Sequence, residues 1–277
     1  SRLLALITEK NIVIKLPDSV PEMVSESLSS LLAGVIIAIV FLIFRALFAV
    51  TPYGNATDCI YTIIQTPLQS LTGNLPAFII IILIAQLLWF FGIHGSMTVL
   101  PILFPIWLSY IGDNTAAMAA GKTIPHVLNI GLWDLANLGG SGATIGLVIL
   151  MFFKAKSNQY KSFGKLTLPC GIFSVNEPVI FGLPVILNPI MLIPFIICPI
   201  VLVCLGYALI QFGIVTAPIG ILGLGSMPPL ISGIMQGSLS WGIYQLVAVV
   251  ISIIIYYPFF KTIDNQALAK EKGEQGE

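Results

Sequence analysis

Long apolar runs, separated by short polar or Gly- and Pro-rich stretches, dominate the pattern of this chain. Three clear runs cover residues 31–50, 186–211 and 240–260. A bilayer core of about 30 Å needs roughly 20 apolar residues in a helix, so each run predicts a membrane-spanning helix. The pattern as a whole indicates an all-α integral membrane protein with multiple transmembrane helices.

The apolar residues 77–110 form a run that is too long for one span. In its middle, the sequence FGIHGSM places His94 between Gly92 and Gly95, and glycine permits sharp turns and close backbone approach. We therefore predict that a break within the membrane divides this run into two segments. Another span follows in the stretch NLGGSGATIGLVILMFF.

The distribution of lysines constrains how the later segments cross the membrane. The stretch KAKSNQYKSFGK predicts a cytoplasmic loop by the positive-inside rule, and residues 263–277 predict a cytoplasmic tail. Only two strong spans lie between them, so the Gly- and Pro-rich segments 171–184 and 213–230 should be re-entrant hairpins. Broken segments at membrane depth need a cavity or protein partners, and in transporters they surround the substrate.

Composition agrees with a membrane protein and excludes other classes. Hydrophobic residues make up 57% of the chain and charged residues 9%, and the mean hydropathy is +1.01, which would leave a soluble protein too little polar surface. A formal net charge of zero gives no basic field that would favour nucleic acid. The cysteines lack CxxC spacing and GGSGATIG lacks the lysine of a phosphate loop, so neither a metal nor a cofactor is expected.

One carboxylate, Glu177, lies in the apolar stretch GIFSVNEPVIFGLP. An ionised group at membrane depth costs roughly 2.5–3.5 kcal/mol on insertion scales unless it has a partner or water. In a functional role Glu177 would bind a substrate hydroxyl and, as a catalytic residue, take its proton. In a structural role it would bind N–H groups of its own hairpin. The neighbouring amide of Asn176 has the same two alternatives.

The break around His94 carries three further candidates. His94 could bind a ligand through either ring nitrogen, or it could be a packed residue bonded to a carbonyl group. Gly95 would allow a ligand or a partner helix to come close to the backbone. Trp89 could stack on the ring of a ligand, although a tryptophan at a membrane interface needs no ligand. Trp133 and Trp241 are weaker candidates of the same kind.

Several motifs together carry a resemblance to a known family. The stretches LLWFFGIHG, GGSGATIGL, NEPVIFGLPVILNPIMLIPF and YYPFFK occur in this order. In these motifs the chain resembles the membrane component, enzyme IIC, of the lactose/cellobiose/chitobiose type of bacterial sugar phosphotransferase system. FSVNEP stands where the family usually reads closer to FNINEP, and GSMPPL lacks a Trp before its Pro pair. The family's N-terminal spans precede the matched region, so we expect the chain to be the C-terminal part of a longer protein or a naturally short variant.

This resemblance implies a permease for a β-linked disaccharide such as cellobiose, chitobiose or lactose. The sugar would be presented to enzyme IIB, a phosphocysteine-bearing partner that donates the phosphoryl group during import. The resemblance further implies a multi-pass protein of the bacterial inner membrane, surrounded by lipid and homodimeric in the full-length protein. The implied substrate-binding residues are His94, Glu177, Asn176, Gly95 and Trp89, with Glu177 also catalytic.

The domain organisation combines this resemblance with a second pattern. Residues 59–74 place apolar side chains at helical spacing with polar residues between them, which predicts an amphipathic helix in the membrane interface. We expect the end of a scaffold region at 1–58, a linker helix at 59–74, a substrate-binding transport domain at 75–262 and a tail at 263–277. Two alternatives remain, a proton-coupled sugar transporter that uses Glu177 and His94 as a relay, and a passive channel or assembly subunit.

Overall fold

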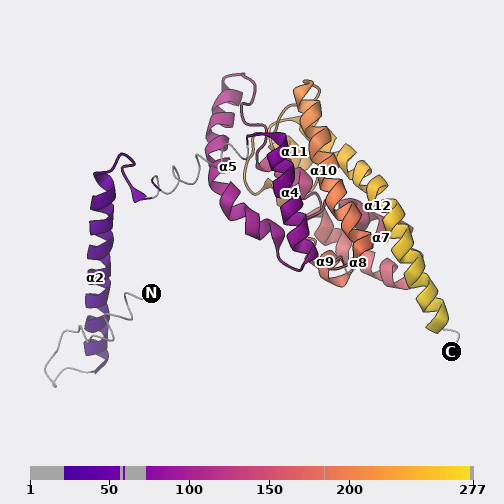
Figure 1. The fold of residues 1–277 in the computed structure, drawn as a ribbon, viewed down its shortest axis with the longest axis horizontal. Helices are drawn as coiled ribbons and strands as arrows, with labels where there is room; N and C mark the ends of the chain where they lie inside the picture. Colours follow the sequence, from indigo (N-terminus) through magenta and orange to yellow (C-terminus); the bar gives the residue numbers. More distant parts are fainter. Residues whose placement is uncertain (1–21, 57–58, 60–72, 184, 275–277) are drawn as a thin grey trace. The chain divides into compact units, whose positions relative to one another are not determined.

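The computed structural model describes residues 22–56, 59, 73–183 and 185–274, and its regular elements are helices (Figure 1). The chain forms two compact units, residues 1–67 and 68–277. In the first unit, helix α2 (Glu22–Ala49) covers the predicted span at 31–50. The linker helix predicted at 59–74 and the polar segment before α2 lie almost wholly outside the described residues.

The described part of the second unit contains three helices that could cross a membrane by length and composition. These are α5 (Gly95–Ala119), α10 (Pro189–Gln211) and α12 (Leu239–Glu274). Helices α10 and α12 confirm the runs predicted as spans at 186–211 and 240–260. The shorter elements are α4 (Leu75–Phe90), α6 (Ile130–Ala136), α7 (Ile145–Lys154), α8 (Asn158–Ile172), α9 (Glu177–Gly182), the 3-10 turn η1 (Leu224–Ser226) and α11 (Ile231–Met235).

The predicted break in the run 77–110 is present between α4 and α5. Helix α4 begins at the cap Asn74, whose side chain accepts the N–H of Ala77 at 2.9 Å. It ends before Gly92, whose φ of 81° lies in the left-handed region that favours glycine. His94 then caps the N-terminus of α5. The break thus places a titratable side chain between two apolar helices.

The lysine-rich stretch 154–165 is only partly the predicted loop: Lys154 ends α7, residues 155–157 connect the two helices, and α8 begins at Asn158. The hydroxyl of Ser157 caps the N-terminus of α8 by accepting the N–H of Tyr160 at 3.3 Å. The buried residues of α8 follow helical spacing, and Gly164 comes so close to Met151 of α7 that a Cβ would lie 2.6 Å from that residue's carbonyl carbon. The helical part was not predicted because the exposed lysines of α8 conceal the spacing of its small and buried positions.

Residues 263–274 of the predicted tail continue α12, and this end of the helix packs against the start of α8. The buried carboxylate of Asp264 accepts the Ser157 hydroxyl at 2.7 Å and the N–H of Lys156 at 2.8 Å. Further along, Glu271 accepts the N–H groups of Asn158 and Gln159. These contacts place the lysine-rich stretch and the end of α12 on the same side of the molecule, as the count of crossings requires.

The Gly- and Pro-rich segment 213–230 has irregular backbone, as predicted, and side-chain amides satisfy it. Gln236 accepts the N–H groups of Gly220 and Ile221 through Oε1 and donates from Nε2 to the Ile221 carbonyl. Asn129 donates to the Pro218 carbonyl at 2.8 Å, and Asn114 donates to that of Ile219 at 2.8 Å. Side-chain amides therefore supply the hydrogen bonds that the backbone of a regular helix makes within itself.

We expect Gln236→Ala to destabilise the second unit by roughly 2 kcal/mol, because it leaves two N–H groups and a carbonyl without their amide partner. The apparent melting temperature of the purified protein in detergent should fall by about 5 °C. Gln211→Ala, at the exposed end of α10, is the matched control and should leave it unchanged. Equal melting temperatures for the two variants would contradict the role given to Gln236.

Candidate functional site

A cavity of about 370 Å³ forms where the irregular segments of the second unit meet. Its walls come from the α4–α5 break, from α6 and the loop after it, from the α8–α9 turn and from η1 with the residue before it. The lining residues are Trp89, His94, Ser96, Met97, Leu100, Ile130, Trp133, Asp134, Asn137, Gly140, Ser141, Ser174, Val175, Asn176, Glu177, Gly223, Gly225 and Ser226. Glu177, His94 and part of the segment 213–230 thus lie at one cavity.

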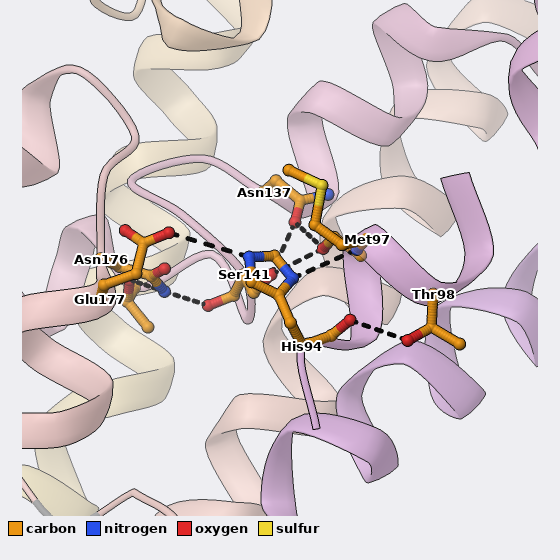
Figure 2. A network of polar contacts seen from close by, with 9 residues as sticks. His94, Met97, Thr98, Asn137, Ser141, Asn176 and Glu177 are labelled. Carbon is orange, nitrogen blue, oxygen red and sulfur yellow. Dashed lines mark hydrogen bonds and ion pairs between the residues drawn. The ribbon is translucent and has the colours of Figure 1, made fainter. Parts of the chain in front are cut away.

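The backbone position of His94 fixes the orientation of its ring. As the cap of α5, its Nδ1 accepts the N–H of Met97 at 3.2 Å, and its carbonyl accepts the Thr98 hydroxyl at 3.0 Å (Figure 2). An Nδ1 that accepts a hydrogen bond carries no proton, so the proton of the neutral ring is on Nε2. That nitrogen lies 3.8 Å from Oε1 of Glu177.

Glu177 is the first residue of α9 and faces His94 across the cavity (Figure 2). About half of its side chain is exposed. Within the described part of the chain, its carboxylate accepts no hydrogen bond from an N–H group of the α8–α9 turn. The structural role weighed from the sequence is therefore not observed, and the carboxylate remains open to a ligand that enters the cavity.

Asn176 serves the structure of the site directly. Its Nδ2 donates to the Ser141 carbonyl at 2.7 Å and to the Thr144 hydroxyl at 3.1 Å. The loop GGSG wraps around this amide, and a Cβ on Gly140, whose φ is 101°, would lie 2.1 Å from the side-chain carbon of Asn176. Asn176 directly precedes Glu177, so its amide hydrogens hold the loop after α6 close to Glu177.

A second set of polar contacts joins the start of α5 to the same loop. The hydroxyl groups of Ser96 and Ser141 are 2.9 Å apart, and both lie within hydrogen-bond distance of the Asn137 side-chain oxygen. These bonds fix the distance between the helix that carries His94 and the loop that holds Asn176. The His94–Glu177 pair is therefore supported from both sides.

Trp89 and Gly95 have different positions relative to the cavity. Trp89 lines it, and its ring centroid lies 4.2 Å from that of His94 at an interplanar angle of 44°. Gly95 does not line it. Instead, a Cβ at Gly95 would lie only 1.8 Å from the Ala85 carbonyl oxygen, so this glycine allows α5 to begin directly against α4. Of the five predicted residues, four surround the cavity and one serves helix packing.

Asp134, which was not among the residues predicted from the sequence, lies on α6 and lines the cavity. Its Oδ2 is buried and has no hydrogen-bond partner among the described residues. Burial raises the pKa of Asp134 to about 8, so the neutral carboxyl group predominates at pH 7. The signal was present in the sequence, because Asp134 is a lone carboxylate in the apolar stretch NIGLWDLANLGG, as Glu177 is in its own.

Metal chemistry finds no support in the described part of the chain. There, no three His, Cys, Asp or Glu side chains come together in a group that could hold a metal ion. The cavity instead combines hydroxyl, amide and carboxyl groups with the rings of Trp89 and Trp133. Such a lining suits a ligand with many hydroxyl groups and apolar ring faces.

Comparison with known proteins gives a consistent family. The model of the phosphotransferase system EIIC family matches residues 3–199. The lichenan permease IIC component of Bacillus subtilis is 38% identical, over 96% of this chain and 60% of its own length. The cellobiose-specific EIIC component of Geobacillus stearothermophilus is also 38% identical, over 97% of this chain and 60% of its own length.

A solved structure agrees with the sequence comparisons. The transporter ChbC, the IIC component from the N,N'-diacetylchitobiose-specific phosphotransferase system, matches with a TM-score of 0.84 and 37% identity, over 98% of this chain and 64% of that chain. The chain thus spans about three fifths of the length of the curated relatives named here. The all-helical membrane fold with several apolar spans is confirmed, and the chain belongs to the EIIC family of the phosphotransferase system, in its lactose/cellobiose/chitobiose branch.

Proposed function

We propose that this chain is the sugar-binding part of a permease that takes up a β-linked disaccharide and presents it to a phosphorylated enzyme IIB. The observation that carries the proposal is the His94–Glu177 pair, 3.8 Å apart, at a cavity of about 370 Å³. Its volume lies within the usual range for small-molecule sites, roughly 300–1,000 Å³. The Nε2–H of His94 is a donor and the Glu177 carboxylate an acceptor, a combination that suits a hydroxyl group.

The charge of the cavity supports a neutral sugar and an external phosphoryl donor. Among the described residues that line it, none is lysine or arginine. A bound nucleotide or another phosphorylated donor would need cations or a phosphate loop at that place. The phosphoryl group therefore comes from a partner protein, and enzyme IIB is the partner that the family implies. The relatives named for lichenan, cellobiose and N,N'-diacetylchitobiose indicate the class of sugar.

Glu177 binds and orients the sugar in this proposal, and its role as a base is secondary. Transfer of a phosphoryl group passes through a loose transition state in which the attacking hydroxyl needs little help to lose its proton. Holding that hydroxyl in line with the donor is then the larger contribution. His94, positioned by the Met97 N–H and by the ring of Trp89, would bind a second oxygen of the same sugar.

The domain organisation belongs to the same proposal. The boundary between the two compact units, at Pro67 and Leu68, falls inside the segment 59–74 that the sequence predicts to be a linker helix. This boundary supports a division into a scaffold part and a substrate-binding part that move relative to each other during transport. In the proposal the scaffold part also forms the homodimer of the complete protein.

The transport assay that tests the proposal uses the complete protein in vesicles whose interior is the cytoplasmic side, with radiolabelled cellobiose added outside as the probe. Sugar phosphate should form only when phosphorylated enzyme IIB is present on the cytoplasmic side, and a pH gradient alone should move no sugar. Uptake that follows the pH gradient without enzyme IIB would overturn the proposal in favour of a proton-coupled transporter in which Glu177 and His94 form a relay.

Glu177→Gln separates binding from proton transfer. The amide keeps an acceptor oxygen and removes the charge, so we expect cellobiose affinity to fall by about tenfold, the scale of one weakened hydrogen bond. Single-turnover phosphorylation at saturating sugar should change by less than about tenfold, whereas loss of a general base costs on the order of 10² or more. Glu271→Gln, outside the cavity, is the matched control and should alter neither value. Wild-type affinity in Glu177→Gln would exclude Glu177 from the site.

A further inference from the structure

Asp134 is a carboxyl group in the cavity that the His94–Glu177 pair does not use. It lies near the end of α6, a seven-residue helix whose cap, Asn129, accepts the N–H of Gly131 at 2.8 Å and donates to the Pro218 carbonyl. Leu135 on the same helix is fully buried against the region of Gly206 in α10. Asp134 is therefore presented to the cavity by a rigidly packed element.

The turn η1 closes over this carboxyl group. A Cβ added to Gly225 would lie 2.4 Å from Oδ1 of Asp134 and 2.7 Å from its carboxyl carbon, so only glycine leaves room for the side chain. Oδ2 is buried and has no hydrogen-bond partner among the described residues. Ion pairs in the described part of the chain join His94 to Glu177 and His126 to Asp113, and Asp134 takes part in neither.

A buried carboxyl group without a cation has a strong preference for its neutral form. An ionised, unpaired carboxylate is costly to bury, whereas a neutral carboxyl group offers one O–H donor besides its acceptor oxygens. The raised pKa of Asp134, about 8, agrees with this geometry. The group resembles the neutral carboxylic acids that donate hydrogen bonds at pH 7 in other binding sites.

We propose that Asp134 is a second sugar-binding carboxyl group, which donates its proton in a hydrogen bond to a sugar oxygen while Glu177 accepts one. The inference rests on the proposed function, since it names a further specificity-determining residue of the same cavity. A neutral carboxyl group favours sugars that place a hydroxyl or glycosidic oxygen next to Asp134, where this oxygen can accept the hydrogen bond. A sugar that places a group without an acceptor next to Asp134 leaves the carboxyl group unpaired and should bind less well.

The described titratable groups around Asp134 come from the cavity and from α10. The titratable side chains that share the cavity are His94 and Glu177. Helix α10, which packs against α6, carries Cys198, Cys204 and Tyr207, and η1 carries none. None of these groups is a permanent cation that would hold Asp134 ionised.

The test compares Asp134→Asn with Asp134→Ala in the complete protein, with cellobiose as the probe. Asparagine keeps the shape and a donor, so affinity at pH 7 should stay within about threefold of wild type, whereas alanine should weaken it by about tenfold or more. Wild-type affinity should fall about tenfold between pH 7 and pH 9, as the proton is lost through a pKa of about 8. Asp134→Asn should lose this pH dependence.

Asp113→Asn is the matched control, because it removes a carboxylate that is paired with His126 outside the cavity; it should keep both the wild-type affinity and the wild-type pH profile. The proposal is overturned if Asp134→Asn binds as weakly as Asp134→Ala, or if Asp134→Ala binds as tightly as wild type. Melting temperatures measured on the same samples identify a folding defect. If Asp134→Ala does not fold, the Asp134→Asn pH profile decides alone.

An infrared readout separates this inference from the proposed function. The C=O stretch of a protonated carboxylic acid should be present in the wild-type protein at pH 7 and absent in Asp134→Asn, whether or not any sugar binds. If the wild-type protein does not bind cellobiose, the proposed function is contradicted. If the carboxylic acid band is absent from the wild-type spectrum at pH 7, the neutral state of Asp134 is contradicted. The two failures therefore have different signatures.

Discussion

An unpaired backbone N–H or C=O group costs several kcal/mol in an apolar surrounding, and this constraint determines how the second unit is built. Its long helices satisfy their own backbone, but the broken segments do not. Amide side chains supply the missing partners. Gln236 and Asn114 serve the segment 213–230, and Asn176 serves the loop after α6. Each of these amides is buried. The irregular backbone can therefore persist among apolar helices, because its hydrogen-bond partners lie in the same interior.

The amides that satisfy the backbone also bring the site together. Asn176 ties the GGSG loop to the residue before Glu177, and the Ser96–Ser141 contact ties the same loop to the helix that His94 caps. His94 therefore meets Glu177 although 83 positions separate them in the sequence. Asn176 and the start of α5 both hold the GGSG loop. A change in that loop should therefore shift both Glu177 and His94.

The sequence allowed prediction of those features that have a large local signature. Glu177 could be found because a lone carboxylate in an apolar run is costly, and His94 because glycines interrupt a run too long for one helix. Asp134 has the same signature, a lone carboxylate in the apolar stretch before GGSG. The helical state of the lysine-rich stretch was hidden, since its contacts with Met151 and Asp264 come from α7 and from α12, more than 100 positions later.

The different uses of Asn176 and Gly95 could not be read from composition or spacing. An amide has the same donors and acceptors toward a sugar as toward a carbonyl group, and only the position of the GGSG loop assigns its hydrogens. In the same way, a glycine beside His94 serves either a ligand or a helix crossing, and the distance to Ala85 assigns it to the crossing. Tertiary contacts, which one sequence does not contain, made both distinctions.

The central claim is that the broken segments enclose a sugar site in which the carboxyl groups of Glu177 and Asp134 both contact the ligand. An experimental structure of the complete protein with cellobiose bound tests it most directly. The account predicts a disaccharide in the cavity of about 370 Å³, with one hydroxyl within hydrogen-bond distance of Glu177 and His94 and another sugar oxygen within that distance of Asp134. A disaccharide bound elsewhere in the protein, with only water in this cavity, would contradict it.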